Sequence, residues 1–120
     1  MNAAGTTTAA LQFAPKFAAL GHEVRLAIVR LLLSANPHGL VVGEIQEDLE
    51  IPPSTLSHHL DALQREGLVA VTREGKYLRY RADAGGLREL LAFLYAECCT
   101  RSQLVPLNPA AWPRVKQSVS

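Results

Sequence analysis

Apolar side chains recur at helical spacing over the N-terminal third of the chain. Over residues 11–20 and 24–32 they return every three or four positions, which predicts two amphipathic helices separated by Gly21. Pro15 falls early in the first helix, where a first turn tolerates proline. The residues before this helix are small and polar, so residues 1–10 are expected to form a flexible N-terminus.

Two shorter helices follow, with a tight break between them. The first is expected over Val42–Leu49, and residues 51–53 (Ile-Pro-Pro) end it because proline does not continue a helix. The second is expected to run from a cap at Ser54 or a neighbour to about Glu66, with Gly67 as its C-terminal stop. Its inward-facing residues are Leu56, Leu60 and Leu63.

A hairpin and a last helix complete the pattern. Residues 68–72 and 77–81 are typical of strands around a turn at Glu74 and Gly75, and a helix is predicted from Leu87 to about Cys99. Two short helices joined by a tight break and followed by a hairpin define a winged helix-turn-helix. The predicted fold is therefore mainly α with a small β-hairpin. It forms one domain over residues 11–100, followed by a proline-containing tail over residues 101–120.

The composition fits one small globular domain. The chain has 120 residues, of which 48% are hydrophobic and 19% charged, a balance typical of folded proteins. A domain of this size buries a modest fraction of its surface, so oligomerisation would add burial. No signal peptide or membrane-length apolar run is present, so we expect a cytoplasmic protein. A Ser/His/Asp array, a phosphate loop and a paired-carboxylate pocket are also missing, which argues against an enzyme.

Positive charge is concentrated in the hairpin. The net charge of +1 says nothing about nucleic acid, but residues 73–81 contain four basic side chains against Glu74 alone. A local basic patch of this kind is what phosphate binding requires. The four basic residues are Arg73, Lys76, Arg79 and Arg81.

The second helix of the predicted pair opens with small polar residues. Its N-terminal half would enter a major groove, where short hydroxyl groups bond base edges or phosphates. The exposed candidates are Ser54, Thr55, Ser57 and His58. Small polar residues also begin many ordinary helices, and it is the basic hairpin directly after this one that favours DNA binding.

The segments ALGHEVRLAIVRLLL and STLSHHLDALQREGLVAVTREGKYLRYR resemble the second helix, recognition helix and wing of ArsR/SmtB repressors. The resemblance covers roughly residues 17–95. It implies a homodimer built on the first and last helices, a palindromic operator, and release from DNA when an inducer binds. By position it makes Ser54, Thr55, Ser57 and His58 base and phosphate readers. Arg73, Lys76 and Arg79 would be the wing contacts.

The metal sites known from relatives of this family are missing. Arsenic- and cadmium-sensing relatives carry a Cys-x-Cys pair at the start of the third helix, but residues 40–45 contain no cysteine. Zinc and nickel relatives use Asp, His and Glu on the last helix, and no histidine follows Leu87. The chain's histidines form no ligand pair either. The adjacent His58 and His59 suit one exposed and one packed position.

Cys98 and Cys99 are the candidate inducer site. Trivalent arsenic favours thiolates, and some ArsR relatives bind arsenicals through a Cys-Cys pair here, usually with a third cysteine nearby. Residues 100–103 lack that third thiol. Two thiols fit a mono-organic arsenical such as methylarsenite, whereas arsenite takes three, unless a partner subunit supplies one. No cofactor is expected to be required for DNA binding itself.

Other interpretations of the same residues stay open. The two cysteines also suit a sensor of thiol oxidation or persulfides, or simple burial as small apolar side chains at a helix interface. A winged helix can also serve only to bind another protein. A steep salt dependence of binding to duplex DNA distinguishes a DNA-binding repressor from such a module.

Overall fold

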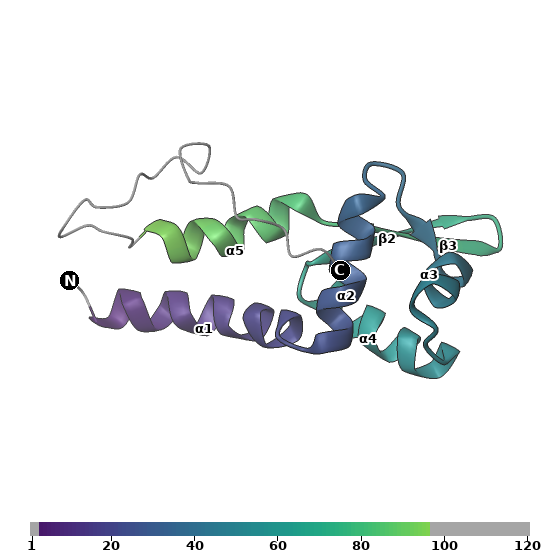
Figure 1. The fold of residues 1–120 in the computed structure, drawn as a ribbon. Helices are drawn as coiled ribbons and strands as arrows, with labels where there is room; N and C mark the ends of the chain where they lie inside the picture. The colour runs from purple at the N-terminus through teal and green to yellow at the C-terminus, as the bar shows by residue number, and fades with distance from the viewer. Residues whose placement is uncertain (1–2, 97–120) are drawn as a thin grey trace, which may run out of the picture.

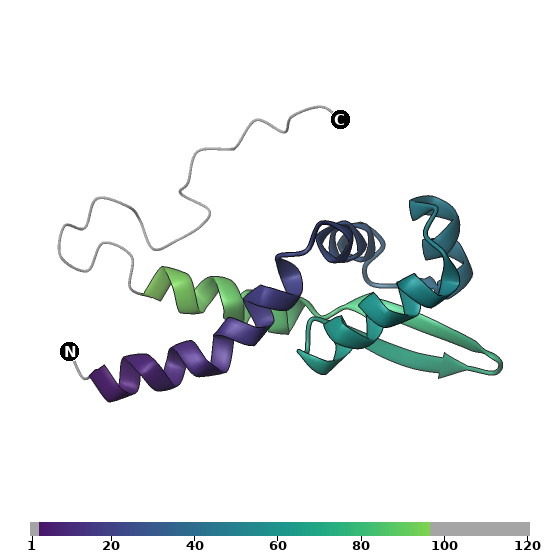
Figure 2. The same cartoon turned by 90° about the horizontal axis from the view of Figure 1, so that it is seen from below.

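The computed structural model of the protein describes residues 3–96, with side chains from residue 8 onward. Within these residues, five helices pack with a small antiparallel sheet, part of which projects from one side of the molecule (Figure 1), and the same arrangement is seen from below in Figure 2. The prediction of a mainly helical winged helix-turn-helix is confirmed. The elements are α1 (Ala3–Leu20), α2 (Glu23–Ser34), β1 (Leu40–Val41), α3 (Val42–Leu49), α4 (Pro53–Arg65), β2 (Val69–Glu74), β3 (Tyr77–Ala82) and α5 (Ala84–Ala96).

The first helix is longer than its apolar pattern predicts. α1 begins at Ala3 rather than Leu11, so the predicted start of the first helix is wrong. Pro15 consequently lies inside the helix and not in its first turn. The early residues are mostly Ala and Thr, which carry no amphipathic pattern, and hydrophobic periodicity therefore could not detect this part of the helix.

The sheet has one strand more than the hairpin that the sequence predicts. β1 pairs with β3 through Leu40 opposite Tyr80 and Val41 opposite Arg79, which gives the strand order β1-β3-β2. A strand of two residues is too short to show an alternating pattern, so the sequence pattern does not predict β1.

The hairpin turn lies one residue later than predicted. β2 runs on through Glu74, which pairs with Tyr77, and so Gly75 and Lys76 form the turn. Gly75 has a φ of +62°, which fits the first central position of a two-residue hairpin turn.

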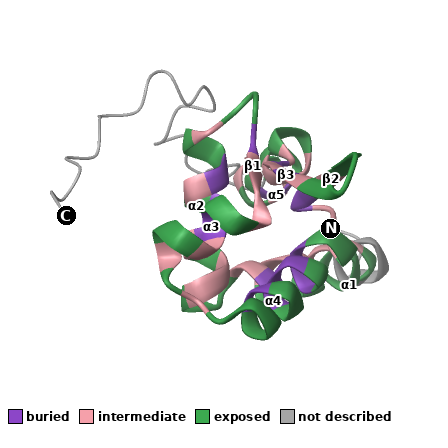
Figure 3. Ribbon diagram, turned by 90° about the vertical axis from the view of Figure 1, so that its right-hand side faces the viewer, coloured by how far each residue is buried: buried purple, intermediate pink, exposed green. Residues whose placement is uncertain are grey.

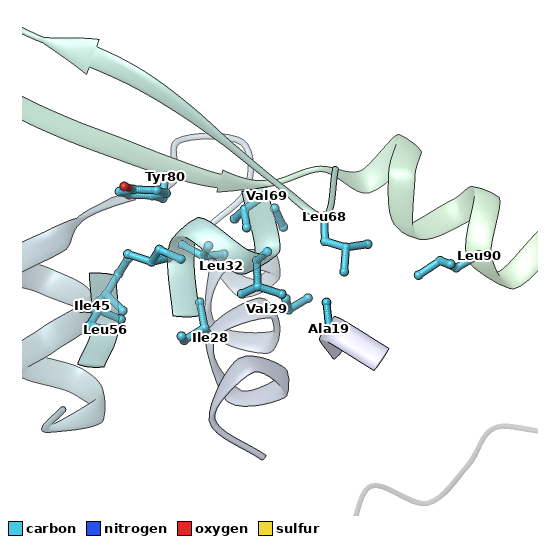
Figure 4. Close-up of a cluster of buried hydrophobic side chains, with 13 residues drawn as sticks. Ala19, Ile28, Val29, Leu32, Ile45, Leu56, Leu68, Val69, Tyr80 and Leu90 are labelled. Carbon is cyan, nitrogen blue, oxygen red and sulfur yellow. The ribbon is translucent and has the colours of Figure 1, made fainter. Parts of the chain in front are cut away.

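The core lies between the sheet and helices α2, α3 and α4 (Figures 3 and 4). Leu56, Leu60 and Leu63 of α4 are buried, as predicted from their spacing. Leu90 of α5 is also buried and belongs to the same cluster, at its end nearest Leu68 and Ala19 (Figure 4). The largest fully buried side chains are Ile28, Leu32, Ile45, Leu56, Leu60, Leu63, Leu68 and Leu90.

Both ends of α4 are fixed by backbone geometry. The sequence predicts a cap at Ser54 or a neighbour, but the N-cap is Pro52, two residues before Ser54, and no side chain caps the helix. Pro53 is the first helical residue. The locked φ of Pro53 suits the first helical position, where its missing N–H costs no hydrogen bond. At the other end Gly67 has a φ of +74° and its N–H donates to the carbonyl of Gln64, which confirms the predicted glycine stop.

Helix α1 contacts both α4 and α5. Lys16 of α1 donates from Nζ to the carbonyl oxygen of Glu66 at 2.6 Å, where α4 ends. Phe13 and Phe93 stack with ring centroids 4.5 Å apart, so that α1 and α5 lie side by side (Figures 1 and 2). Within residues 3–96, no helix is long and apolar enough to cross a bilayer.

Candidate nucleic-acid interface

Helix α4 has one buried face and one exposed polar face. The buried face carries the three core leucines and His59, which point toward α2 and the sheet. The four residues predicted to read DNA are all exposed. Ser54, Thr55, Ser57 and His58 occupy the N-terminal half of the helix, the half that winged helices place in a groove.

The exposed face continues beyond the residues that the sequence singled out. Asp61, Gln64 and Arg65 are exposed on α4, and together with His58 they line a shallow depression. The spacing from Ser54 to His58, Asp61 and Arg65 follows one side of a helix. Continuing that spacing past His58 would have found them in the sequence.

The strand register separates the basic residues of the wing, which is the β2–β3 hairpin. Arg73 pairs with Leu78, and Thr72 pairs with Arg79. Because successive side chains on a strand point to opposite faces, Arg73 and Arg79 lie on opposite sides of the hairpin. The two predicted contacts therefore do not form one surface.

Arg79 has partners within the protein. Its Nε donates to Oε1 of Glu74 at 2.9 Å, and its Nη1 donates to the carbonyl oxygen of Gly39 at 3.4 Å. Arg81 behaves similarly, donating from Nε to the carbonyl of Pro37 and from Nη1 to Oγ1 of Thr72. Through these hydrogen bonds the two arginines connect the wing to the loop between α2 and β1.

Arg73 and Lys76 lie at the tip of the wing. Both side chains are exposed. Arg73 donates from Nε to the carbonyl oxygen of Gly75 at 3.2 Å, a contact that leaves its charge unneutralised. The Lys76 ammonium lies 5.7 Å from the ring centroid of Tyr77. Of the three predicted wing contacts, these two are the ones the fold presents to a partner.

His59 occupies the inner side of α4. It is only 7% exposed while its neighbour His58 is exposed, which confirms the prediction of one packed and one exposed histidine. Nδ1 of His59 accepts a hydrogen bond from Nε of Arg25, on α2, at 3.0 Å. Burial lowers the pKa of His59 below its ordinary value, and the nearby His22, Arg25 and His58 lower it further.

The predicted inducer site lies outside the described residues. Cys98 and Cys99 follow α5 in the sequence, beyond its last described residue, Ala96. Within residues 3–96, no group of three His, Cys, Asp or Glu side chains is arranged to hold a metal ion.

Comparison with known proteins identifies the family of this fold. A helix-turn-helix domain model matches residues 20–72. The transcriptional activator HlyU of Vibrio cholerae is 33% identical over 85 residues, which span 71% of this chain and 76% of HlyU. The chain belongs to the ArsR-like family of winged helix-turn-helix transcriptional regulators.

Solved structures of this family share the fold. An ArsR-like transcriptional regulator from Rhodococcus sp. RHA1 is 29% identical, with a TM-score of 0.64 over 77% of this chain and 81% of that one. The homodimeric winged helix-turn-helix DNA-binding domain Mb0332 of Mycobacterium bovis is 27% identical, with a TM-score of 0.59 over 75% of this chain and 82% of that one. The ArsR-like protein is thus a DNA-binding regulator and not an enzyme, as its sequence predicts.

Proposed function

We propose that this ArsR-like protein is a homodimeric repressor that reads a palindromic operator and is released by a trivalent arsenical bound at Cys98 and Cys99. The DNA-binding part of this proposal rests on the exposed polar face of α4 and on the exposed basic tip of the wing, where Arg73 bonds only to a backbone carbonyl among the contacts described. The inducer half rests on the chemistry of the two adjacent thiols.

The readers of the operator are the exposed residues of α4 and the wing tip. Ser54, Thr55, Ser57 and His58 supply short donors and acceptors for base edges and phosphates. Arg73 and Lys76 supply positive charge for the backbone of the adjacent groove. Arg79, which the family resemblance also assigns to DNA, is given a lesser part because Glu74 already balances its charge.

The dimer is proposed to form on α1 and α5. Leu11 of α1 is 72% exposed, and Leu91 and Leu94 of α5 are 67% and 57% exposed. This apolar surface adjoins the stacked Phe13 and Phe93, and the solved Mb0332 domain is homodimeric. A two-fold dimer presents two copies of α4 to two half-sites, which makes the operator a palindrome.

The inducer is proposed to act at the end of the dimer helix. Cys98 and Cys99 follow Ala96, the last described residue of α5, after one intervening residue in the sequence. Adjacent side chains on a regular helix point about 100° apart, so the two sulfurs of one subunit can bind the same arsenic atom only if the helical turn is distorted. Alternatively, the arsenic atom would bridge sulfurs of the two subunits. Either change would alter the spacing of the two α4 helices and weaken operator binding.

DNA binding is tested first, by fluorescence anisotropy on an operator selected from a randomised duplex pool. Tight binding that weakens steeply with salt supports the repressor. Absence of selectable DNA, or binding insensitive to salt, would favour a winged-helix module that binds only proteins.

The inducer is tested on that complex by titrating methylarsenite, arsenite, zinc and an oxidant in parallel. We expect methylarsenite to release the DNA, and Cys98→Ser and Cys99→Ser to bind operator normally without being released. Ser102→Ala is the matched control, because it alters a nearby tail residue without removing a thiol. If only the oxidant releases the DNA, the inducing signal is oxidation and not an arsenical. If methylarsenite releases the DNA from both cysteine variants, Cys98 and Cys99 are not the inducer site.

A further inference from the structure

Arg25 lies where α2 approaches the inner side of α4. Its Nε donates to Nδ1 of His59 at 3.0 Å. The ring of His22, the N-cap residue of α2, has its centroid 4.7 Å from that of His59, and the ring of the exposed His58 has its centroid 5.6 Å from that of His59. The guanidinium of Arg25 therefore lies in a cluster that reaches the DNA-facing side of α4 through His58.

The charge of Arg25 is not balanced by the described part of the chain. His59, its hydrogen-bond partner, has a lowered pKa and is neutral at pH 7. Among residues 8–96, Arg79 forms an ion pair with Glu74, but no carboxylate forms an ion pair with Arg25. Glu23, in the first turn of α2, is exposed and forms no ion pair with it.

A half-buried guanidinium without a counterion is an unusual arrangement. Charges withdrawn from water are normally paired, because desolvation of an unpaired charge is costly. Arg25 uses one of its five N–H donors on His59, which holds the group in place and leaves the two terminal nitrogens for an anion. A planar guanidinium with both terminal nitrogens available matches the geometry of a phosphate.

We propose that Arg25 binds a backbone phosphate of the DNA that flanks α4, with His59 holding the guanidinium in position. His22 is a second donor to the same phosphate. Its Nδ1 accepts from the backbone N–H of Val24 at 3.1 Å, so its proton is on Nε2. The inference rests on the proposed DNA binding and extends the contact surface from α4 and the wing to the start of α2.

The test uses the full chain and a mixed-sequence DNA duplex of about 30 base pairs, long enough for two half-sites one turn apart. The variant is Arg25→Gln, whose amide still donates to His59 but carries no charge. Each phosphate contact contributes about 0.9 to the slope of log affinity against log salt concentration, so losing one contact per subunit lowers the slope of a dimer by about 1.8. We also expect binding to weaken about tenfold or more at ~0.1 M salt.

Two further variants separate a phosphate contact from a structural role. Arg25→Lys keeps the positive charge and should retain most of the slope. Arg30→Gln removes an exposed charge from the same helix and should leave both slope and affinity unchanged. Thermal unfolding of each variant checks that the fold is intact.

The possible outcomes identify which idea fails. If Arg25→Gln weakens binding without changing the slope, Arg25 only positions α4 and the phosphate contact is wrong. An unchanged affinity and slope overturns the inference as well. If the unaltered protein shows no salt-dependent binding to any duplex, the proposed DNA-binding function itself fails.

Discussion

The two ends of the molecule expose different kinds of side chain. At the end formed by α4 and the wing, the exposed residues are mostly polar or basic, with Tyr77 and Leu78 at the wing tip as apolar exceptions. At the end formed by α1 and α5, the most exposed large apolar residues are leucines, and Leu11 and Leu91 are 72% and 67% exposed.

This difference indicates two different partners. A polar and basic surface can exchange its contacts with water for contacts with phosphates and base edges, whereas exposed leucines are stabilised only when another apolar surface covers them. A second copy of the chain presents the same leucines. The α1–α5 end therefore fits self-association, and the α4–wing end fits a charged partner.

The largest expected effect comes from placing a charge at the apolar end. Leu91→Glu puts two carboxylates into the proposed dimer interface and removes a side chain worth about 1.5–3 kcal/mol when buried. We expect the dimer dissociation constant, measured by analytical ultracentrifugation, to rise at least about 100-fold, since two copies are lost at once. Affinity for a two-half-site duplex should fall with it.

Leu33→Glu is the matched control for this change. Leu33 is 42% exposed on α2, away from α1 and α5, so a carboxylate there should leave the dimer intact. A Leu91→Glu protein that remains dimeric would show that the α1–α5 end does not self-associate, and would remove the contrast between the two ends.

A smaller effect is expected within the wing, where the arginines divide into two classes. Arg73→Ala with Lys76→Ala should lower the slope of log affinity against log salt concentration by up to about 3.6 in a dimer, at two contacts per subunit. Arg79→Ala should leave that slope nearly unchanged and should instead lower the free energy of unfolding by about 1 kcal/mol or less, since an exposed ion pair contributes little. Equal slope losses for both variants would contradict the division.

The sequence predicts the parts of this molecule that depend on local pattern. Helical spacing predicts that Leu56, Leu60 and Leu63 form the buried face of α4, and Gly67 predicts where that helix ends. The hydrogen-bond partners of Arg79 and His59 could not be predicted from local pattern. Arg79 acquires Gly39 as a partner through strand pairing, and the partner of His59 lies 34 residues away in the chain.

The same limit applies to the basic residues of the hairpin. Four basic residues close together in the sequence suggest one surface, but period-two alternation places Arg73 and Arg79 on opposite faces. Only the register, together with the positions of Glu74 and Gly39, shows which charges are already engaged. The polar face of α4 was predicted more reliably because a single helix determines it.

The smallest expected effect concerns His59, the buried histidine of the α4–wing end. In the folded protein the pKa of His59 is below its unfolded value of 6.5, chiefly because of burial. Below pH 6.5 the unfolded chain therefore takes up a proton that the folded chain does not, and the free energy of unfolding falls as the pH falls. Well above pH 6.5 His59 is neutral in both states and contributes no pH dependence.

His59→Asn tests this directly, because its amide oxygen can accept from Arg25 in place of Nδ1 but does not titrate. Thermal unfolding between about pH 7.5 and 5.5, above the range where carboxylates titrate, should show a shallower loss of stability than in the unaltered protein. His38→Asn, at an exposed histidine in the α2–β1 loop, should leave the pH dependence unchanged. If His59→Asn retains the full pH dependence, the buried histidine is not its source. The apolar α1–α5 end has no buried histidine among the described residues, so the acid sensitivity of folding should belong to the α4–wing end.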